Sequence, residues 1–136
     1  ETTFTDLTAN WYQNAVLWAY QTGVASGMSE TTFAPDDPVT REQVTVFLAE
    51  FADRVLDKYT PYMWDALFPF QDRESISYYA RTAMNWACNL GLIKGIPGPG
   101  GLRLEPQSYA TREQMAVILA QFCRELNVWN EPMPEL

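Results

Sequence analysis

The sequence predicts an all-α fold in which two helix–loop–helix repeats pack into one helical bundle. Three observations support this prediction: an ordered set of short motifs occurs twice, each copy contains two stretches with helical spacing of apolar residues, and no alternating strand pattern extends beyond a few residues. The 136 residues are 47% hydrophobic and 14% aromatic, which is enough apolar material for a packed interior. We therefore expect one domain built from two related units.

The two copies are identified by motifs that recur in the same order. The first copy contains Phe4-Thr5-Asp6, Trp11, Trp18, Gly23, Gly27, Phe33-Ala34-Pro35 and Thr40-Arg41-Glu42-Gln43. The second contains Phe70-Gln71-Asp72, Tyr79, Trp86, Gly91, Gly95, Leu104-Glu105-Pro106 and Thr111-Arg112-Glu113-Gln114. The offset between copies is 66 at the first motif, 68 from Tyr79 to Gly95, and 71 from Pro106 onward. Insertions therefore fall between motifs, as expected for loops on a helical scaffold.

The first helix of each copy is predicted from an apolar stripe that a glycine can end. The stripe in the first copy precedes Gly23 and consists of Trp11, Ala15, Trp18 and Ala19. The stripe in the second copy precedes Gly91 and consists of Tyr79, Ala83, Trp86, Ala87 and Leu90. Because Trp18 and Trp86 lie in the middle of their stripes, we expect both in the core.

The second helix of each copy begins at a marked position. Thr40 with Gln43, and Thr111 with Gln114, fit the capping box, in which the first side chain accepts from the third helical N–H and the Gln side chain accepts from the cap N–H. The apolar residues that follow are Val44, Phe47, Leu48, Phe51 and Val55 in the first copy and Met115, Ile118, Leu119, Phe122 and Leu126 in the second. Neither copy can bury its apolar face alone, so we expect the two to pack together or with further copies.

These boundaries divide the chain into four segments: repeat 1 (residues 1–58), an aromatic linker (59–69), repeat 2 (70–127) and a C-terminal tail (128–136). We expect the linker to pack over the joint between the repeats; its alternative interpretation is a sugar platform or a partner-binding patch. Gly27 and Gly95 lie in the crossovers between helices, where the backbone is expected to turn sharply.

Composition excludes several classes of function. The net charge of −8 leaves no basic face for nucleic acid or for anionic lipid, and no apolar stretch is long enough to span a membrane. Residues 1–3 show no signal-peptide pattern. The absence of histidine removes the usual general base and the commonest metal ligand, so we predict no catalysis, metal or cofactor. Cys88 and Cys123 could form a disulfide, although two buried free thiols are the preferred interpretation.

The ordered motifs, present twice, resemble the S-layer homology repeat over about residues 4–56 and 70–127. The family's Thr-Arg-Ala-Glu signature stands here without its alanine, as Thr40-Arg41-Glu42 and Thr111-Arg112-Glu113. The resemblance implies a non-catalytic, extracellular module that anchors proteins at the bacterial cell surface. It also implies non-covalent binding of secondary cell-wall polysaccharide, often with pyruvylated sugars, in grooves between repeats.

The family commonly has three repeats, and only two are present here. A further repeat could complete the set, two chains could assemble as a homo-oligomer, or the pair could serve another use. The alternative function is therefore a protein-interaction or self-assembly module built from an incomplete set of repeats.

The strongest candidate ligand-binding residues are Arg41 and Arg112. Each stands at the first helical position, where a cation faces the positive end of the helix dipole, and a locally unfavourable residue placed there twice suggests a use. An arginine fork beside free helix N–H groups would hold a carboxylate. Alternatively, each Arg pairs with a carboxylate of the neighbouring repeat and locks the units together.

The remaining candidates are weaker, and each has a structural alternative. Trp11 could stack on a sugar face, with Tyr79 in its place in repeat 2. Asp6 and Asp72 could accept from sugar hydroxyls or simply form turns. The cap residues and crossover glycines complete the candidate set; these are Thr40, Thr111, Gly27 and Gly95.

Overall fold

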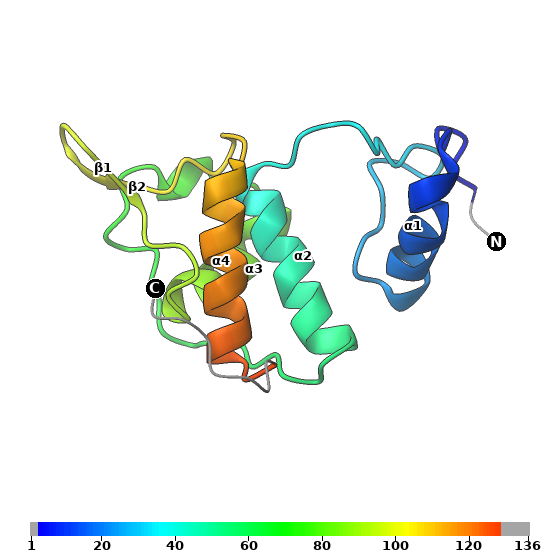
Figure 1. Cartoon of the computed structure of the whole chain (residues 1–136). Helices are drawn as coiled ribbons and strands as arrows, with labels where there is room; N and C mark the ends of the chain where they lie inside the picture. The colour runs from blue at the N-terminus through cyan, green and yellow to red at the C-terminus, as the bar shows by residue number, and fades with distance from the viewer. Residues whose placement is uncertain (1–2, 129–136) are drawn as a thin grey trace.

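The structure, a computed structural model, describes residues 3–128 and is mostly helical (Figure 1). Its elements are α1 (Asn10–Thr22), α2 (Arg41–Arg54), two 3₁₀ turns (Arg73–Ser75 and Tyr78–Ala80), α3 (Arg81–Asn89), β1 (Ile96–Gly98), β2 (Gly101–Arg103) and α4 (Arg112–Glu125). The strands form a single antiparallel hairpin in the glycine-rich insertion of repeat 2. The all-α prediction is confirmed, with this hairpin as an addition.

The core is shared between the repeats, because α2 of repeat 1 packs with α3 and α4 of repeat 2 (Figure 1). Trp86 on α3 is only 1% exposed, and its ring lies 6.5 Å from that of Phe122 on α4. Phe122 in turn lies 6.1 Å from Phe51 on α2. These rings join the three helices into one apolar cluster.

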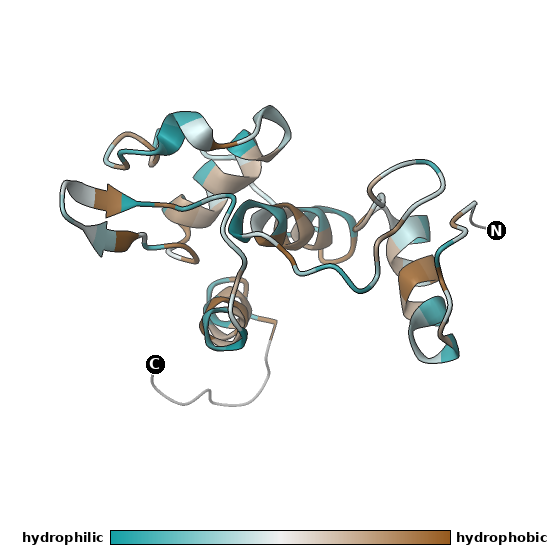
Figure 2. Cartoon of the chain, turned by 90° about the horizontal axis from the view of Figure 1, so that it is seen from above, coloured by the Kyte–Doolittle hydropathy of each residue, from teal (hydrophilic) through white to brown (hydrophobic). Residues whose placement is uncertain are grey.

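Helix α1 lies apart from this core in both the side view and the view from above (Figures 1 and 2). Its Trp18 approaches Phe51 at 6.3 Å between ring centroids but remains 46% exposed. The prediction that Trp18 is a core residue is therefore wrong, whereas the equivalent Trp86 is buried as expected. The difference arises because α3 is covered by α2 of the other repeat, and α1 has no comparable cover among residues 3–128.

The predicted helix ends are confirmed at the positions set by local sequence. Gly23 follows α1 with φ of +81°, and Gly91 follows the α3 segment with φ of +75°, a conformation that glycine adopts without strain. Both capping boxes form, with Thr40 accepting from Gln43 N–H and Thr111 accepting from Gln114 N–H. Tyr79 differs from prediction, since it lies in a 3₁₀ turn before α3 rather than on its apolar stripe.

The aromatic linker is fastened to α3 by amide side chains. Asn85 donates to the carbonyl of Trp64 at 3.0 Å, and Asn89 donates to the same carbonyl at 3.1 Å. The Tyr59 ring packs 5.4 Å from that of Trp86, while Met63 and Trp64 point into solvent. Part of the linker therefore packs on the joint, as expected, and part is exposed.

The C-terminal tail, the two cysteines and the absence of a membrane span were also predicted. Apart from Val128, the predicted tail lies outside the described residues. Cys88 and Cys123 are free thiols, partly buried at the edge of the core. Between residues 3 and 128, no helix combines the length and apolar character needed to cross a membrane.

Candidate functional site

The start of α2 is embedded in a loop of repeat 2. Thr40 forms an antiparallel bridge with Tyr109, and the Arg41 N–H donates to the carbonyl of Ser108 at 2.8 Å. The Glu42 N–H donates to the carbonyl of Pro106 at 3.0 Å. N–H groups that a helix start leaves without intrahelical partners are thus satisfied by the other repeat.

An aspartate sets the conformation of this loop. The Asp72 carboxylate accepts from the N–H groups of Leu104 at 2.7 Å and Glu105 at 2.8 Å, and Glu105 adopts φ of +49°. The carbonyl of Leu104 then accepts from Nε of Arg41 at 2.8 Å. Asp72 therefore positions the acceptor that holds the arginine.

Repeat 1 contains the same loop. Asp6 accepts from the N–H groups of Phe33 at 3.0 Å and Ala34 at 2.7 Å, and Ala34 adopts φ of +59°. These backbone donors lower the pKa of Asp6 because they stabilise its charged form. Both aspartates thus act on the backbone of their own repeat.

Glu42 is the most heavily bonded side chain of the joint. The residue is 2% exposed, and its carboxylate accepts from the Ser77 N–H at 2.9 Å and the Ser77 hydroxyl at 2.6 Å. The Tyr79 hydroxyl donates at 3.3 Å and the Gln107 amide at 3.4 Å. A buried carboxylate requires such donors, so Glu42 fastens repeat 1 to repeat 2.

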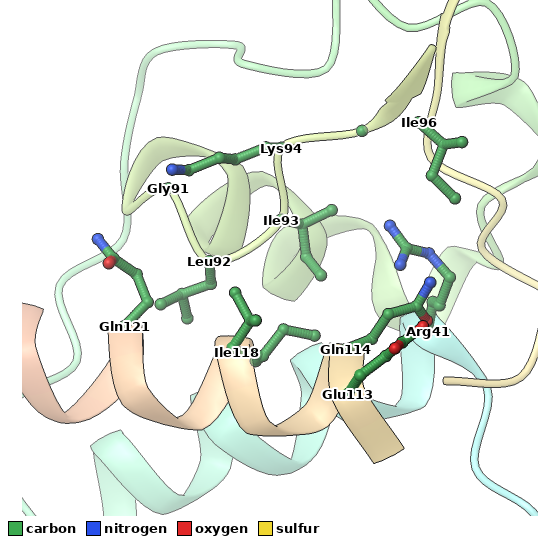
Figure 3. A pocket seen from close by; sticks show the side chains of 12 residues that line it. Arg41, Gly91, Leu92, Ile93, Lys94, Ile96, Glu113, Gln114, Ile118 and Gln121 are labelled. Atoms are coloured by element: carbon green, nitrogen blue, oxygen red, sulfur yellow. The ribbon is translucent and has the colours of Figure 1, made fainter. Parts of the chain in front are cut away.

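Arg41 is 5% exposed, and burial is the main cause that lowers its pKa, partly offset by the carboxylates of Glu105 and Asp72. Its Nε is satisfied by Leu104, while the rest of its guanidinium points into a groove (Figure 3). The arginine therefore does lock the repeats together, but through a backbone carbonyl rather than the expected ion pair.

The groove has a volume of about 610 Å³ and lies between α4 and the segment from Gly91 to Ile96. Arg41 lies at one end, and Lys94 and Gln121 lie toward the other, near Gly91 (Figure 3). The walls between them are mostly apolar and consist of Leu92, Ile93, Ile96, Val117 and Ile118. Glu113 and Gln114, from the start of α4, complete the rim beside Arg41.

Of the predicted site residues, the structure brings Arg41 and Gly95 together in this groove. Tyr79 lies nearby through its bond to Glu42, whereas Arg112 is exposed at the start of α4 and does not line the groove. Trp11 is 86% exposed on α1.

The other predicted residues shape the backbone of the turns, loops and helix starts. Gly27 and Gly95 pass under the rings of Phe4 and Phe70, where a Cβ would meet ring carbons at 2.6 Å and 2.5 Å. The other four are the helix caps Thr40 and Thr111 and the loop-holding Asp6 and Asp72.

Sequence reasoning missed Glu42 as a joint residue and Lys94 as a groove residue. An acidic residue is favourable in the first turn of any helix, and Glu113 has the same position on α4, so the sequence alone does not distinguish Glu42 as a joint residue. The sequence signal for Lys94 is its place inside the Gly91–Gly95 turn, where the equivalent of repeat 1 is Ser26.

Comparison with known proteins identifies the family. The family model described as S-layer homology domain matches residues 3–45 and 69–116. The chain belongs to the S-layer homology domain family. Domains of this family are non-catalytic modules that anchor proteins at the cell surface, which places the chain outside the cell, at the wall. The two matched segments each contain one Thr-Arg-Glu motif.

Relatives of this S-layer homology chain are large proteins. It is 32% identical over 85% of its length to an amylopullulanase of Thermoanaerobacterium thermosulfurigenes and 32% identical over 81% to exoglucanase XynX of Acetivibrio thermocellus. It is 29% identical over 87% to the surface-layer 125 kDa protein of Lysinibacillus sphaericus. The chain spans 6%, 10% and 10% of these proteins, respectively. No solved structure matches the chain.

Proposed function

We propose that this chain attaches non-covalently to an anionic secondary cell-wall polysaccharide, and that the groove beside Arg41 holds a carboxylate of the polymer, such as a pyruvyl ketal. The observation that carries the proposal is the placement of Arg41. A guanidinium fixed at Nε by a backbone carbonyl is pre-oriented, and its remaining N–H groups face a groove (Figure 3). Such a fork binds carboxylates bidentately.

Charge supports an anionic ligand at this place. The chain has a net charge of −8, yet Arg41 and Lys94 both line the groove. Burial of Arg41 strengthens its interaction with an anion, because the local dielectric constant is lower than in water.

The groove walls support a sugar that carries an apolar group. Ile93 and Ile118 offer apolar contact between the two cations, and Gln114 and Gln121 offer amides for hydroxyl groups. A pyruvyl ketal combines a carboxylate with a methyl group, so both parts of it find suitable partners. Glu113 at the rim supplies a carboxylate that can accept from sugar hydroxyls.

Co-sedimentation with purified cell walls tests the proposal. We expect the chain to pellet with native walls and to remain in the supernatant after mild acid has removed the pyruvyl groups. Equal binding to both wall preparations, or binding to neither, contradicts the proposal that the groove holds a carboxylate of the polymer. Because the attraction is electrostatic, added salt should weaken it.

A pair of charge variants on α4 localises the contact. Val117 lines the groove and Leu119 does not, although both are exposed residues of the same helix. We expect Val117→Glu to lower the wall-bound fraction at least several-fold by repelling the anion, and Leu119→Glu to leave it unchanged. Equal loss in both variants, or in neither, rejects this groove as the binding site.

The variant Arg41→Lys tests whether binding requires the two parallel N–H groups of the guanidinium or only its positive charge. Lysine retains the positive charge but cannot offer two parallel N–H groups, so we expect weaker binding than in the unmodified chain. Arg112→Lys is the matched control at the exposed equivalent position. Far-UV circular dichroism of both variants confirms that the helices remain folded before binding is compared.

A further inference from the structure

Lys94 is the second cation of the groove. It lines the groove at the end near Gly91 and Gln121, whereas Arg41 lies at the opposite end (Figure 3). Lys94 is exposed, and its ammonium group makes no ion pair or hydrogen bond within residues 3–128. A cation at each end of one groove matches a ligand with two separate negative charges.

The groove is longer than a single sugar. Along α4 its lining includes Gln114 and Gln121, and the rise of about 1.5 Å per residue puts these two positions about 10 Å apart along the helix. This length and the volume of about 610 Å³ exceed one pyranose ring with its substituents and suit two linked sugars. When a carboxylate of one sugar binds Arg41, the next part of the polymer therefore reaches the Lys94 end.

We propose that Lys94 forms a second anionic subsite, which takes another carboxylate of the same polymer. This inference rests on the proposed function, because the carboxylate at Arg41 sets the polymer in the groove. The repeating structure of a polysaccharide supplies the second carboxylate. Between the two cations, the apolar side chains of Ile93 and Ile118 contact the faces of the sugar rings. The groove thereby selects a polymer whose successive carboxylates match the spacing of its two ends.

The two cations differ in what they select. Arg41 is buried and fixed at Nε by the carbonyl of Leu104, so its fork sets the position and orientation of one carboxylate. Lys94 is exposed, and an ammonium group on a flexible stem attracts an anion without fixing its orientation. Lys94 therefore adds affinity for ligands that carry the second charge. Repeat 1 has the uncharged Ser26 at the equivalent position, so the subsite is a feature of repeat 2.

Calorimetry with two probes tests this subsite in the full chain. The first probe is the methyl glycoside of one pyruvylated sugar, which has a single carboxylate, and the second is purified wall polysaccharide cut to fragments with at least two carboxylates. At low ionic strength we expect Lys94→Gln to weaken fragment binding roughly two- to fivefold, the range for a solvent-exposed ion pair, and to leave monosaccharide binding unchanged. Arg41→Lys should weaken both. High salt should remove the effect of Lys94→Gln, because it screens exposed charges.

Two variants control for charge. Lys94→Arg keeps the cation, so we expect it to bind the fragments as the unmodified chain does. Arg103 is an exposed cation of β2 that does not line the groove, so Arg103→Gln removes the same charge elsewhere and should leave both affinities unchanged.

The outcomes separate this subsite from the carboxylate site at Arg41. The subsite is rejected if Lys94→Gln binds the fragments as tightly as the unmodified chain, if it loses affinity for both probes equally, or if Arg103→Gln weakens binding as much. It is also rejected if Lys94→Gln still weakens binding after mild acid has removed the pyruvyl groups from the fragments. Loss in Arg41→Lys alone leaves the proposed function standing without the subsite, and loss in neither variant rejects both.

Discussion

At the scale of single residues, the joint depends on Glu42, which joins a helix start that occurs in both repeats to the neighbouring repeat. The side chain accepts four hydrogen bonds from three residues of repeat 2. Its equivalent, Glu113, is exposed. Position within the fold, rather than residue type, decides how much each glutamate contributes to stability.

Truncation of the two glutamates should therefore have unequal effects. We expect Glu42→Ala to lower the free energy of unfolding by about 3 kcal/mol, because it removes the charged acceptor of four hydrogen bonds that join the two repeats. Glu113→Ala should change it by less than about 0.5 kcal/mol, as is usual for surface positions. Urea titration followed by tryptophan fluorescence measures both; equal effects would contradict the assigned role of Glu42.

A second residue-scale prediction concerns Cys88, whose thiol pKa is raised to about 12 by burial, with Arg41 acting in the opposite direction. The folded thiol therefore stays protonated at pH 8, and in Cys123→Ala we expect iodoacetamide to alkylate Cys88 at least ~100-fold more slowly than in the denatured chain. Mass spectrometry of timed samples measures the alkylation rate, and rapid alkylation of folded protein would exclude the buried environment.

The same raised pKa affects stability. Unfolding releases the thiol proton above about pH 9, so Cys88 makes the fold less stable as pH rises above that value.

At the scale of elements, the crossover turns are determined by glycine and an aromatic ring. Gly95 has φ of +82° and lies under Phe70, where an added Cβ would meet a ring carbon at 2.5 Å. Gly91 has φ of +75°, but its added Cβ would meet only the end of Gln121 at 3.9 Å. The two positions share the backbone requirement and differ in the space available.

Alanine substitution at these glycines distinguishes the cost of backbone strain, which both positions share, from the cost of displacing the Phe70 ring, which only Gly95 has. Gly91→Ala should cost about 1 kcal/mol for its left-handed backbone. Gly95→Ala should cost about 2–4 kcal/mol, since it adds displacement of the Phe70 ring to the same strain. Thermal unfolding by circular dichroism compares the two variants. A smaller loss for Gly95→Ala than for Gly91→Ala would show that the ring moves aside freely.

Local sequence was sufficient to predict the helix ends but not the surroundings of each helix. The capping boxes and the glycine stops depend on neighbouring residues, so Thr40, Thr111 and Gly23 behave as predicted. Trp18 and Trp86 occupy equivalent stripes, yet only Trp86 is covered by another repeat. Arg41 and Arg112 differ for the same reason. A motif that occurs twice does not show which copy contacts a neighbouring repeat, so the sequence alone does not distinguish Arg41 from Arg112.

At the scale of the whole molecule, the repeats do not coincide with the packing units. The α2–α4 core takes one helix from repeat 1 and two from repeat 2. Among residues 3–40, only Val16 and Ala25 are buried hydrophobic residues, and neither belongs to the main cluster. Stability should therefore be distributed unevenly along the chain.

This uneven distribution predicts that α1 opens without the rest of the fold. Helix α1 is held mainly by the Trp18–Phe51 contact and by its own loop, whereas α3 is buried between α2 and α4. In native-state hydrogen exchange, we expect the amides of Asn10–Thr22 to exchange at least tenfold faster than those of Arg81–Asn89, equivalent to an opening free energy lower by about 1.4 kcal/mol. Low denaturant should leave the exchange of α1 unchanged while accelerating that of α3, because only the opening of α3 exposes the core. If both helices exchange at one rate with one denaturant dependence, α1 belongs to the same cooperative unit.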